Sequence, residues 1–522
     1  MELRIDADAV ERCRELARRA VEPVSEFIAA HSTVSIERAV LRLFGVTGAD
    51  DEGTPLVNAI VDALPPEQRA RGAGSTFAAL VSVTGMAPSD VAWALAEGDI
   101  DFTLAEGGAD AAAREAIDRH IEVALGRIRA RREQRNALLA RLPQQPAPLL
   151  YVIVASGNIY EDRTAAVAAA EAGAQIVAVI RSTGQSLLDF VPEGATTEGF
   201  GGTYATQENF RIMRAALDIA GEKLGRYVML TNYASGLCMP EIAALAALER
   251  LDMLLNDSMY GILFRDINMQ RTFVDQHFSR TLNAAAGIVI NTGEDNYLTT
   301  ADAVVQAPAV LASQFINEEF AHRAGLPDAQ IGLGDAFEID PDLEDAFLLQ
   351  LAQAQLARQI FPGAPLKYMP PTKHMTGDIF KGHRIDAMFD LCSVMTHQTI
   401  HLCGMMTEAI HTPLLHDRAL SLEGARYIMN TARSLGDELE IKPGGKIERR
   451  AAELLQQTET LLERVAAMGL MAAIEARVFA DVSRSPTGGR GLEGVFERAP
   501  DYWNPFEEAL APRHASAGAE RL

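Results

Sequence analysis

The sequence is poor in residues that form covalent or metal cross-links. It has only four cysteines among 522 residues, and they are widely scattered with no paired spacing: Cys13, Cys238, Cys392 and Cys403. We therefore expect reduced thiols rather than a disulfide framework or a zinc site. The sequence also lacks a run of about twenty apolar residues and a hydrophobic opening segment, so we expect neither export nor a membrane span, and a cytoplasmic location.

Positive charge is scarce as well. The 47 lysines and arginines are outnumbered by 71 aspartates and glutamates, which gives a net charge of −24. A strongly acidic chain disfavours nucleic acids and anionic membranes as partners. Hydrophobic residues make up 48% of the chain, which at this length is enough to build two or three domains.

The first part of the chain has a helical pattern. Apolar residues recur three and four positions apart, which predicts an N-terminal helical accessory region over residues 1–145. Its last helix is strongly basic on one face, which could bind an anion but more simply faces solvent or an acidic partner. The sequence QQPAP at residues 144–148 then breaks the helix and indicates a linker.

From residue 146 to 411, short apolar runs alternate with helical segments. Runs that are apolar on both faces and separated by helices indicate a parallel sheet, and eight of them predict an α/β fold of the (β/α)₈ barrel type, a TIM barrel. An open doubly wound sheet is the alternative. We expect strands at 149–156, 175–181, 226–232, 252–257, 287–293, 330–335, 366–371 and 400–406.

Residues 412–522 return to a helical pattern. They predict a C-terminal helical extension, followed by a glycine-rich tail that could cap the barrel or dock onto a partner.

Polar residues follow the expected strands, where both folds place their chemistry. The stretch from Arg181 to Arg211 is the most polar of these segments. It has Arg181 at its start, several hydroxyls, and glycines at positions 184, 199, 201 and 202 among others. Arginine can bind a phosphate through two hydrogen bonds, and glycines let backbone amides come close to it. The stretch therefore indicates a phosphate-bearing ligand, although a surface loop rich in turn residues is an alternative.

The residues at the strand ends suit pyridoxal 5'-phosphate (PLP) and a sugar phosphate equally well. Lys367 is one of only six lysines and the only one at an expected strand end. A stand-alone barrel lyase or aldolase acting on a phosphorylated substrate could use it as a Schiff base. Otherwise, Lys367 neutralises Asp295 or Asp335.

No metal site is predicted. Four histidines cluster in the sequence, at His397, His401, His411 and His416, but no carboxylate completes a metal-ligand pattern. The run TKHMTG is similar to the DxHxxG signature of cobalamin binding, but it has Thr372 where that signature requires aspartate.

Several long blocks resemble the large (α) subunit of the D-lysine 5,6-aminomutase family. Among them are RSTGQSLLDFVPEGATTEGFGGTYATQENFR, NTGEDNYLTTADA and PLKYMPPTKHMTGDIFKGH, and the resemblance extends from about Val10 to Phe506. It implies a radical 1,2-migration of the terminal amino group of D-lysine or L-β-lysine from C6 to C5, in a lysine-degradation route. The implied cofactors are PLP and adenosylcobalamin. The implied partner is a small cobalamin-binding subunit that supplies the Schiff-base lysine for PLP, in an α₂β₂ heterotetramer.

The resemblance also assigns roles to individual residues. It gives Arg181, Ser186 and Arg265 to the PLP phosphate, Tyr260 to stacking on the pyridine ring, Ser235 to the ring nitrogen, and Asp295 to the imine and phenolic oxygen. Tyr260 and Asp295 are then the catalytic residues. Lys367 matches the lysine that holds the substrate carboxylate, which replaces its role as a Schiff base.

One position departs from the family pattern. Phe190 stands where the family usually has tyrosine, so we expect looser PLP binding and an altered substrate preference. A further alternative is a non-catalytic relative, in which Tyr260 and Asp295 are merely structural.

Overall fold

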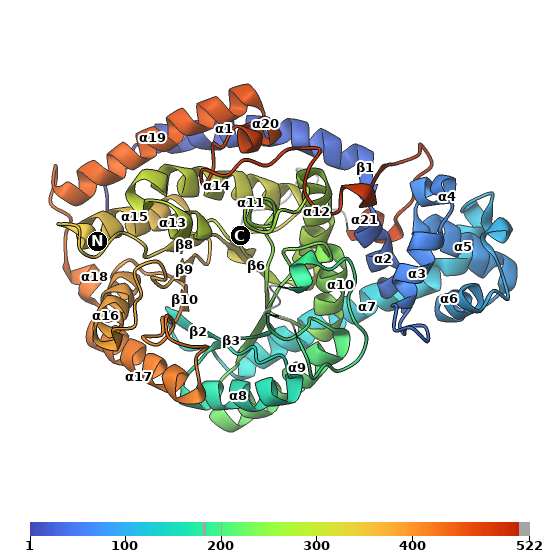
Figure 1. Cartoon of the computed structure of the whole chain (residues 1–522), viewed down its shortest axis with the longest axis horizontal. Helices are drawn as coiled ribbons and strands as arrows, with labels where there is room; N and C mark the ends of the chain where they lie inside the picture. The colour runs from blue at the N-terminus through green and yellow to red at the C-terminus, as the bar shows by residue number, and fades with distance from the viewer. Residues whose placement is uncertain (181–183, 200, 511–522) are drawn as a thin grey trace, which may run out of the picture.

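The computed structural model describes residues 1–180, 184–199 and 201–510. Its centre is a ring of parallel strands surrounded by helices (Figure 1). Each of the eight apolar runs expected as strands contributes to this ring. The strands are β2 Leu149–Ile153, β3 Ile176–Ile180, β4 Met229–Tyr233, β5 Met253–Leu255, β6 Val289–Asn291, β7 Ile331–Gly332, β8 Gly334–Ala336, β9 Lys367–Met369 and β10 Ile400–Leu402.

The ring of strands is closed. β10 pairs in parallel with β2 on one side and with β9 on the other. β7 and β8 are two parts of one strand that is interrupted at Leu333: β7 pairs with β6, and β8 pairs with β9. The sheet therefore has the eight strand positions of a (β/α)₈ barrel, which confirms the predicted fold and excludes the open doubly wound sheet.

Side chains alternate between the inside and the outside of the barrel because successive residues of a strand point to opposite faces. Leu149 and Tyr151 of β2 belong to an apolar cluster that draws on most of the strands and fills the interior. Leu150 and Val152 instead join the main core between strands and helices. By the same alternation, Lys367 points into the barrel, since its neighbour Leu366 belongs to the outer core.

The helices that cover the barrel follow the strands in order. They are α8 Ile159–Ala172, α9 Gln207–Leu224, α10 Met239–Glu249, α11 Ser258–Arg265, α12 Met269–Ala286, α13 Asn296–Thr300, α14 Ala303–Arg323, α15 Ala346–Ile360, α16 Ile379–Met395 and α17 Leu415–Thr431. α17 packs against both α16 and α8. The ring of helices thus continues past residue 411, where the sequence places the end of the barrel.

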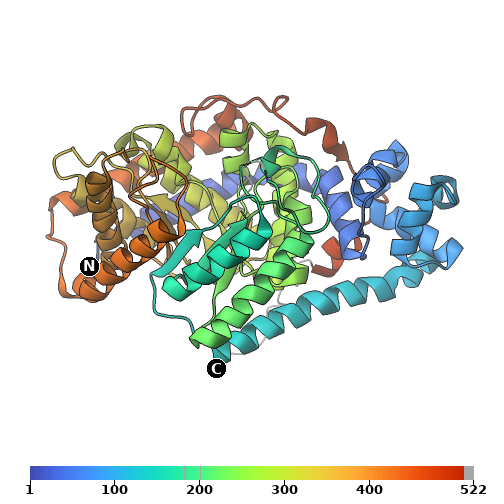
Figure 2. The same cartoon turned by 60° about the horizontal axis from the view of Figure 1, so that its bottom comes forward.

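The N-terminal region is helical, as predicted, and divides into two parts. α1 (Ala7–Ala30) lies along the barrel beside α19 (Lys446–Met468) and packs on α14 (Figure 1). The next helices form a lobe to one side, and α7 (Ala111–Arg141) returns from it to the barrel (Figure 2). The lobe consists of α2 Val34–Leu43, α3 Leu56–Ala63, α4 Pro66–Arg71, α5 Ala73–Thr84 and α6 Pro88–Glu97.

Among the described helices, none is by itself long and apolar enough to cross a membrane. α5 and α6 meet that length and composition only when they are taken together, and they are bent by 91° where they join.

The C-terminal extension packs back onto its own chain. After α18 (Leu435–Glu438), α19 and α20 (Leu470–Glu475), the short strand β11 (Val495–Glu497) pairs antiparallel with β1 (His31–Thr33). α21 (Pro505–Leu510) then packs on α12. The glycine-rich tail approaches the barrel closely, since a Cβ at Gly489 would lie 2.8 Å from the backbone nitrogen of Asn268.

The basic face of α7 docks this helix onto the barrel. Arg131 Nε donates to the carbonyl of Leu248 (3.0 Å), and Arg132 Nη1 donates to that of Ala285 (3.1 Å). Arg135 donates to the carbonyls of Ala286 (3.1 Å) and Leu251 (2.8 Å). These carbonyls lie at or just beyond the C-terminal ends of α10 and α12, where a helix leaves its last acceptors without partners.

We expect Arg135→Gln to destabilise the protein by about 2–4 kcal/mol, because it leaves buried carbonyls and the nearby Asp252 carboxylate with fewer partners. Urea unfolding measures this change. The control is Arg129→Gln on the same helix, since Arg129 pairs with Glu122 at 3.2 Å and both side chains are exposed. The control should change stability by less than about 0.5 kcal/mol. Equal effects of the two changes would contradict the docking role.

Candidate active site

The predicted site residues lie on loops and short helices at the carboxyl ends of neighbouring strands. Ser186 is in the 3₁₀ helix η2 (Gln185–Leu187) after β3, and Ser235 follows β4. Tyr260 and Arg265 are on α11 after β5, and Asp295 directly precedes α13 after β6. Arg181 lies outside the described residues. The barrel topology brings these loops to one mouth.

Lys367 reaches the mouth from deeper in the barrel. It is the first residue of β9, not a residue at the end of the strand as the sequence suggested. Its Nζ nevertheless donates to the carbonyl of Thr292 (2.7 Å) and forms an ion pair with Asp295 Oδ1 (3.0 Å). The stagger of the strands explains this contact: Lys367 is level with Gly334, whose amide donates to Thr292 Oγ1 at 3.0 Å.

The ion pair between Asp295 and Lys367 is almost completely buried, with 1% and 4% of the two side chains exposed. Burial raises the pKa of Asp295, and the neighbouring ammonium of Lys367 offsets only part of that rise. Asp295 Oδ2 also accepts a hydrogen bond from Asn296 Nδ2 (3.1 Å). A carboxyl held in this way can keep or give up a proton at the mouth.

Tyr260 forms a flat, supported surface in the mouth. Gly293 lies directly against its ring, since a Cβ at residue 293 would be only 2.8 Å from the Tyr260 Cβ. The guanidinium of Arg265 lies over the ring, 5.0 Å from its centre, and an Arg265 Nη2 group donates to the Tyr260 hydroxyl. These contacts hold the ring in one orientation. The Arg265 guanidinium is a cation over the electron-rich face of the ring, and the attraction between them adds to this support.

Ser186 and Ser235 are brought together by a close approach of two loops. A Cβ at Gly236 would lie 2.6 Å from the Cα of Ser186, and Leu237 N donates to the Ser186 carbonyl (3.2 Å). α11 also contacts η2, so the loop with Ser186 and the helix with Tyr260 are neighbours.

Asp257 organises the mouth, although the sequence predicted only that it lies at a strand end. Its amide donates to Ser235 Oγ (2.8 Å), and its Oδ1 accepts from Met259 N (3.0 Å) at the start of α11. Its Oδ2 accepts from Gly293 N (2.9 Å). The backbone amide and the carboxylate of this one residue thus connect the loops after β4, β5 and β6. An aspartate directly before a helix is a common N-cap, and this was the signal available in the sequence.

A second buried carboxyl, that of Glu294, lies next to Asp257 and shares a hydrogen-bond donor with it. Asn317 of α14 donates to Glu294 Oε1 (2.7 Å) and to Asp257 Oδ1 (3.4 Å). Burial and the nearby Asp257 raise the pKa of Glu294 to about 8. The raised pKa favours the protonated form of Glu294, which avoids two negative charges side by side.

Some polar atoms in the barrel interior are not satisfied by the protein. Among the described residues, Thr231 Oγ1 and Asn291 Nδ2 have no hydrogen-bond partner, and both residues are buried. Ser235 Oγ accepts one strong hydrogen bond, but the carbonyl it can donate to, that of Leu255, is 3.5 Å away. Buried polar groups are normally paired, so this set suits a polar ligand in the mouth.

These residues fit PLP as the ligand. Ser186 lies against Gly236, on the loop that carries Ser235, and the fixed ring of Tyr260 offers a stacking surface. The Ser235 hydroxyl, which donates only a long hydrogen bond of 3.5 Å to the Leu255 carbonyl, can turn to donate to a ligand. The Asp295 carboxyl is buried beside them. Phe190, the departure from the family pattern, lies four residues after Ser186 on the loop that follows β3, and it is 37% exposed. The individual ligand contacts stay predictions.

The histidines take up separate positions. His401 Nε2 lies 2.9 Å from Asp390 Oδ1, and its ring stacks on Phe389. His397 and His411 are partly exposed and lie near Asp437 and Asp417. In the part of the chain that the structure describes, no three His, Cys, Asp or Glu residues are grouped so as to hold a metal ion.

Asp335 does not belong to the mouth, contrary to the expectation that it lies there and can neutralise Lys367. It pairs in register with Tyr368, which packs in a core cluster with Phe337 and Phe389. Its Oδ1 accepts hydrogen bonds from Gln353 Nε2 of α15 (2.6 Å) and from Ala336 N (2.7 Å). Asp335 therefore points outward, to the helices. Burial raises its pKa to about 7.

We expect Asp335→Asn to stabilise the protein at pH 8, because an amide oxygen accepts the same two hydrogen bonds without a buried charge. The unfolded aspartate has a pKa of about 3.9, so the folded wild type loses stability as the pH rises from there to about 7. The gain should be on the order of 2–4 kcal/mol at pH 8 and clearly smaller at pH 5. Urea unfolding at both pH values measures it, with Asp340→Asn, at an exposed residue, as control. An equal gain at both pH values would contradict the buried-charge explanation.

The fold and the mouth together define a class: a (β/α)₈ barrel enzyme with its site at the carboxyl ends of the strands. Comparison with known proteins makes the class more specific. Residues 3–509 match the family model described as the D-lysine 5,6-aminomutase TIM-barrel domain of the alpha subunit. The chain therefore belongs to the D-lysine 5,6-aminomutase alpha-subunit family.

Individual relatives agree with this family. The chain is 52% identical over 509 residues to the lysine 5,6-aminomutase alpha subunit of Acetoanaerobium sticklandii, covering 97% of this chain and 98% of that protein. It is 55% identical over 506 residues to the lysine 5,6-aminomutase alpha subunit of Fusobacterium nucleatum, with the same coverage of 97% and 98%. D-ornithine 4,5-aminomutase subunit beta of A. sticklandii is 29% identical over 374 residues, which cover 69% of this chain and 50% of that protein.

The chain is thus an aminomutase, and so an isomerase, of a kind that depends on a cofactor. As an alpha subunit it belongs to an enzyme with more than one kind of subunit.

Proposed function

We propose that this chain is the PLP-binding catalytic subunit of a lysine 5,6-aminomutase. The enzyme would move the terminal amino group of D-lysine or L-β-lysine from C6 to C5. A small partner subunit would bind adenosylcobalamin and supply the lysine that holds PLP, in an α₂β₂ assembly. The observation that carries the proposal is the buried ion pair between Asp295 and Lys367, whose charged atoms are 3.0 Å apart. Asp295 is on the same loop as Gly293, which supports the Tyr260 ring.

When bound, adenosylcobalamin supplies the radical that starts the rearrangement, and PLP carries the nitrogen that migrates. The residues of this chain bind, orient and shield the reacting groups from water. Ser186 would hold the phosphate together with Arg181 and, near Tyr260, Arg265. Tyr260 would stack on the pyridine ring.

Ser235 would set the electronic character of the ring. Its hydroxyl can donate a hydrogen bond to the ring nitrogen, but a serine does not protonate that nitrogen as an aspartate would. The ring then remains a weak electron sink, which suits a radical migration better than carbanion chemistry.

Lys367 is placed to bind the substrate carboxylate. An ammonium has three donors, and Lys367 uses two of them on Thr292 and Asp295, which leaves one for the substrate. Asp295, whose pKa is raised by burial, would hold or release a proton next to the migrating nitrogen.

The alternative is a stand-alone lyase or aldolase with Lys367 as a Schiff base. It is disfavoured because the Lys367 ammonium is held by the Thr292 carbonyl and ion-paired with Asp295, and an ion-paired ammonium has no free electron pair with which to attack a carbonyl.

The proposal is tested with the chain alone and with its co-expressed small subunit, in the presence of PLP, adenosylcobalamin and D-lysine or L-β-lysine. We expect turnover only from the complex. Borohydride reduction of the complex with PLP should attach the cofactor to the small subunit and leave Lys367 unlabelled, as read by peptide mass spectrometry. Turnover by the isolated chain, or a label on Lys367, would overturn the proposal.

We expect Lys367→Met in the complex to raise KM for the substrate by about 10- to 100-fold, the effect of losing a buried charged hydrogen bond. Borohydride labelling of the small subunit should persist, because this residue would hold substrate and not PLP. Steady-state kinetics measures the effect. Lys373→Met is the matched control, since Lys373 Nζ donates to the Ala301 carbonyl (2.6 Å) at an exposed position. Loss of labelling in Lys367→Met with unchanged KM would contradict the assigned role.

A further inference from the structure

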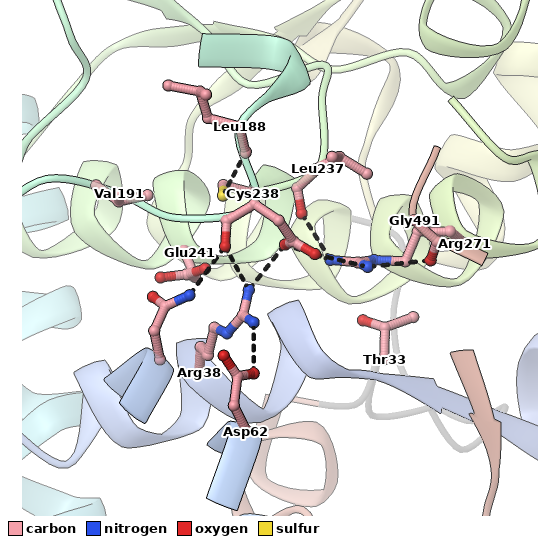
Figure 3. A network of polar contacts seen from close by, with 12 residues as sticks. Thr33, Arg38, Asp62, Leu188, Val191, Leu237, Cys238, Glu241, Arg271 and Gly491 are labelled. Carbon is pink, nitrogen blue, oxygen red and sulfur yellow. Dashed lines mark hydrogen bonds and ion pairs between the residues drawn. The ribbon is translucent and has the colours of Figure 1, made fainter. Parts of the chain in front are cut away.

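The loop that carries Ser186 is anchored three residues further on, at Asp189. Arg38 Nη1 of α2 donates to both the carbonyl (2.8 Å) and Oδ1 (2.7 Å) of Asp189. Arg271 of α12 donates to both carboxylate oxygens, at 2.8 and 3.3 Å. Figure 3 shows Arg38 and Arg271 reaching the same polar network from different elements.

The lobe holds the same loop at further points. Asn58 Nδ2 of α3 donates to the Asp189 carbonyl (2.9 Å). Arg42, one turn after Arg38 on α2, donates to the Val191 carbonyl (3.1 Å) and to Glu193 Oε1 (2.9 Å). Residues four apart lie on one face of a helix, so Arg38 and Arg42 of α2 both contact the loop, between residues 189 and 193.

Arg271 connects this loop to its neighbours. Its side chain is fully buried, and it donates to the carbonyls of Leu237 (3.0 Å) and Gly491 (3.2 Å). Leu237 N in turn donates to the Ser186 carbonyl (3.2 Å). The C-terminal tail can approach because it has glycine here, since a Cβ at Gly494 would lie 2.2 Å from Arg271 Nη1.

The charges make this anchor strong. Burial alone would raise the pKa of Asp189, but Arg271 and Arg38 more than offset that effect, and the pKa lies below its usual value. The carboxylate therefore stays ionised between two guanidinium groups at neutral pH. Charged hydrogen bonds of this kind are stronger than neutral ones.

We propose that the N-terminal lobe serves as a clamp on the phosphate-binding loop, with Arg38, Asp189 and Arg271 as positioning residues for the PLP phosphate. The proposal rests on the function proposed above, in which Ser186 binds that phosphate. A loop that is already ordered loses less conformational entropy when the ligand binds. The clamp acts on the phosphate end of the cofactor. It does not act on the pyridine end, where Asp257 and Gly293 support the Tyr260 ring independently.

The test compares PLP with pyridoxal, which has the same ring but no phosphate. In the complex with the small subunit, we expect Arg38→Gln to weaken PLP binding by about tenfold, as for the loss of a charged hydrogen bond. Pyridoxal binding should be unchanged. Titration followed by visible absorbance gives both dissociation constants, and Arg38→Lys, which keeps the charge, should recover part of the preference.

Arg14→Gln is the matched control. Arg14 also joins an N-terminal helix to the barrel, through Glu318 (3.1 Å) and the Ile360 carbonyl (3.0 Å), but away from the loop. It should leave the ratio of the two dissociation constants unchanged. Asp189→Asn keeps the shape of the anchor and removes its charge, so it provides the same test if Arg38→Gln does not fold.

The two proposals fail in different ways. If the wild-type complex binds PLP no more tightly than pyridoxal, the proposed function itself is wrong. If the wild type prefers PLP and that preference persists in Arg38→Gln or, where this variant does not fold, in Asp189→Asn, the clamp is wrong. A parallel loss of affinity for PLP and pyridoxal would also overturn the clamp, because it would show a general loss of structure.

Discussion

The positive charge of Arg271, buried in the middle of the molecule, is the constraint on which the surrounding structure depends. A buried guanidinium is costly unless acceptors satisfy it. Here the acceptors come from the chain on all sides: Asp275 of its own helix at 2.9 Å, Asp189 after β3, Leu237 after β4 and Gly491 of the tail. Satisfying one side chain therefore fixes the relative positions of two mouth loops and the C-terminal tail.

Closure of the barrel imposes a second constraint, on the depth at which side chains act. Because the strands are staggered, the first residue of β9 lies level with residues just beyond β6. A short side chain at residue 367 would end within the apolar interior of the barrel and would not reach the mouth. The long side chain of lysine brings its ammonium to the Asp295 carboxylate. The alternation of side chains along a strand separates Asp335 from the mouth, because Asp335 is in register with Tyr368, which lies on the outer face.

The sequence predicted the barrel well because parallel strands are buried on both faces and so appear as continuous apolar runs. It could not show the interruption at Leu333, which depends on how the ring closes. The loops at the mouth could be located from the polar residues at the strand ends. The roles of Ser186, Ser235, Tyr260 and Asp295 came from the resemblance to a family, and neither signal indicated the residues that support these loops. Arg38 and Asp189 are 151 positions apart, and no local pattern connects them. Asp257 showed only the N-cap signal that many helices share.

The proposed division of labour between two subunits explains why so much of this chain supports loops. An enzyme that holds PLP through its own lysine has a covalent bond to keep the cofactor in place. If the lysine belongs to the partner, this chain must orient the cofactor through non-covalent contacts alone, and loose loops would make that binding weak. Asp257 then serves the ring end and Asp189 the phosphate end, each through a carboxylate that joins several segments. On this argument, the helical lobe outside the barrel is part of the cofactor site, although none of its residues needs to touch the cofactor.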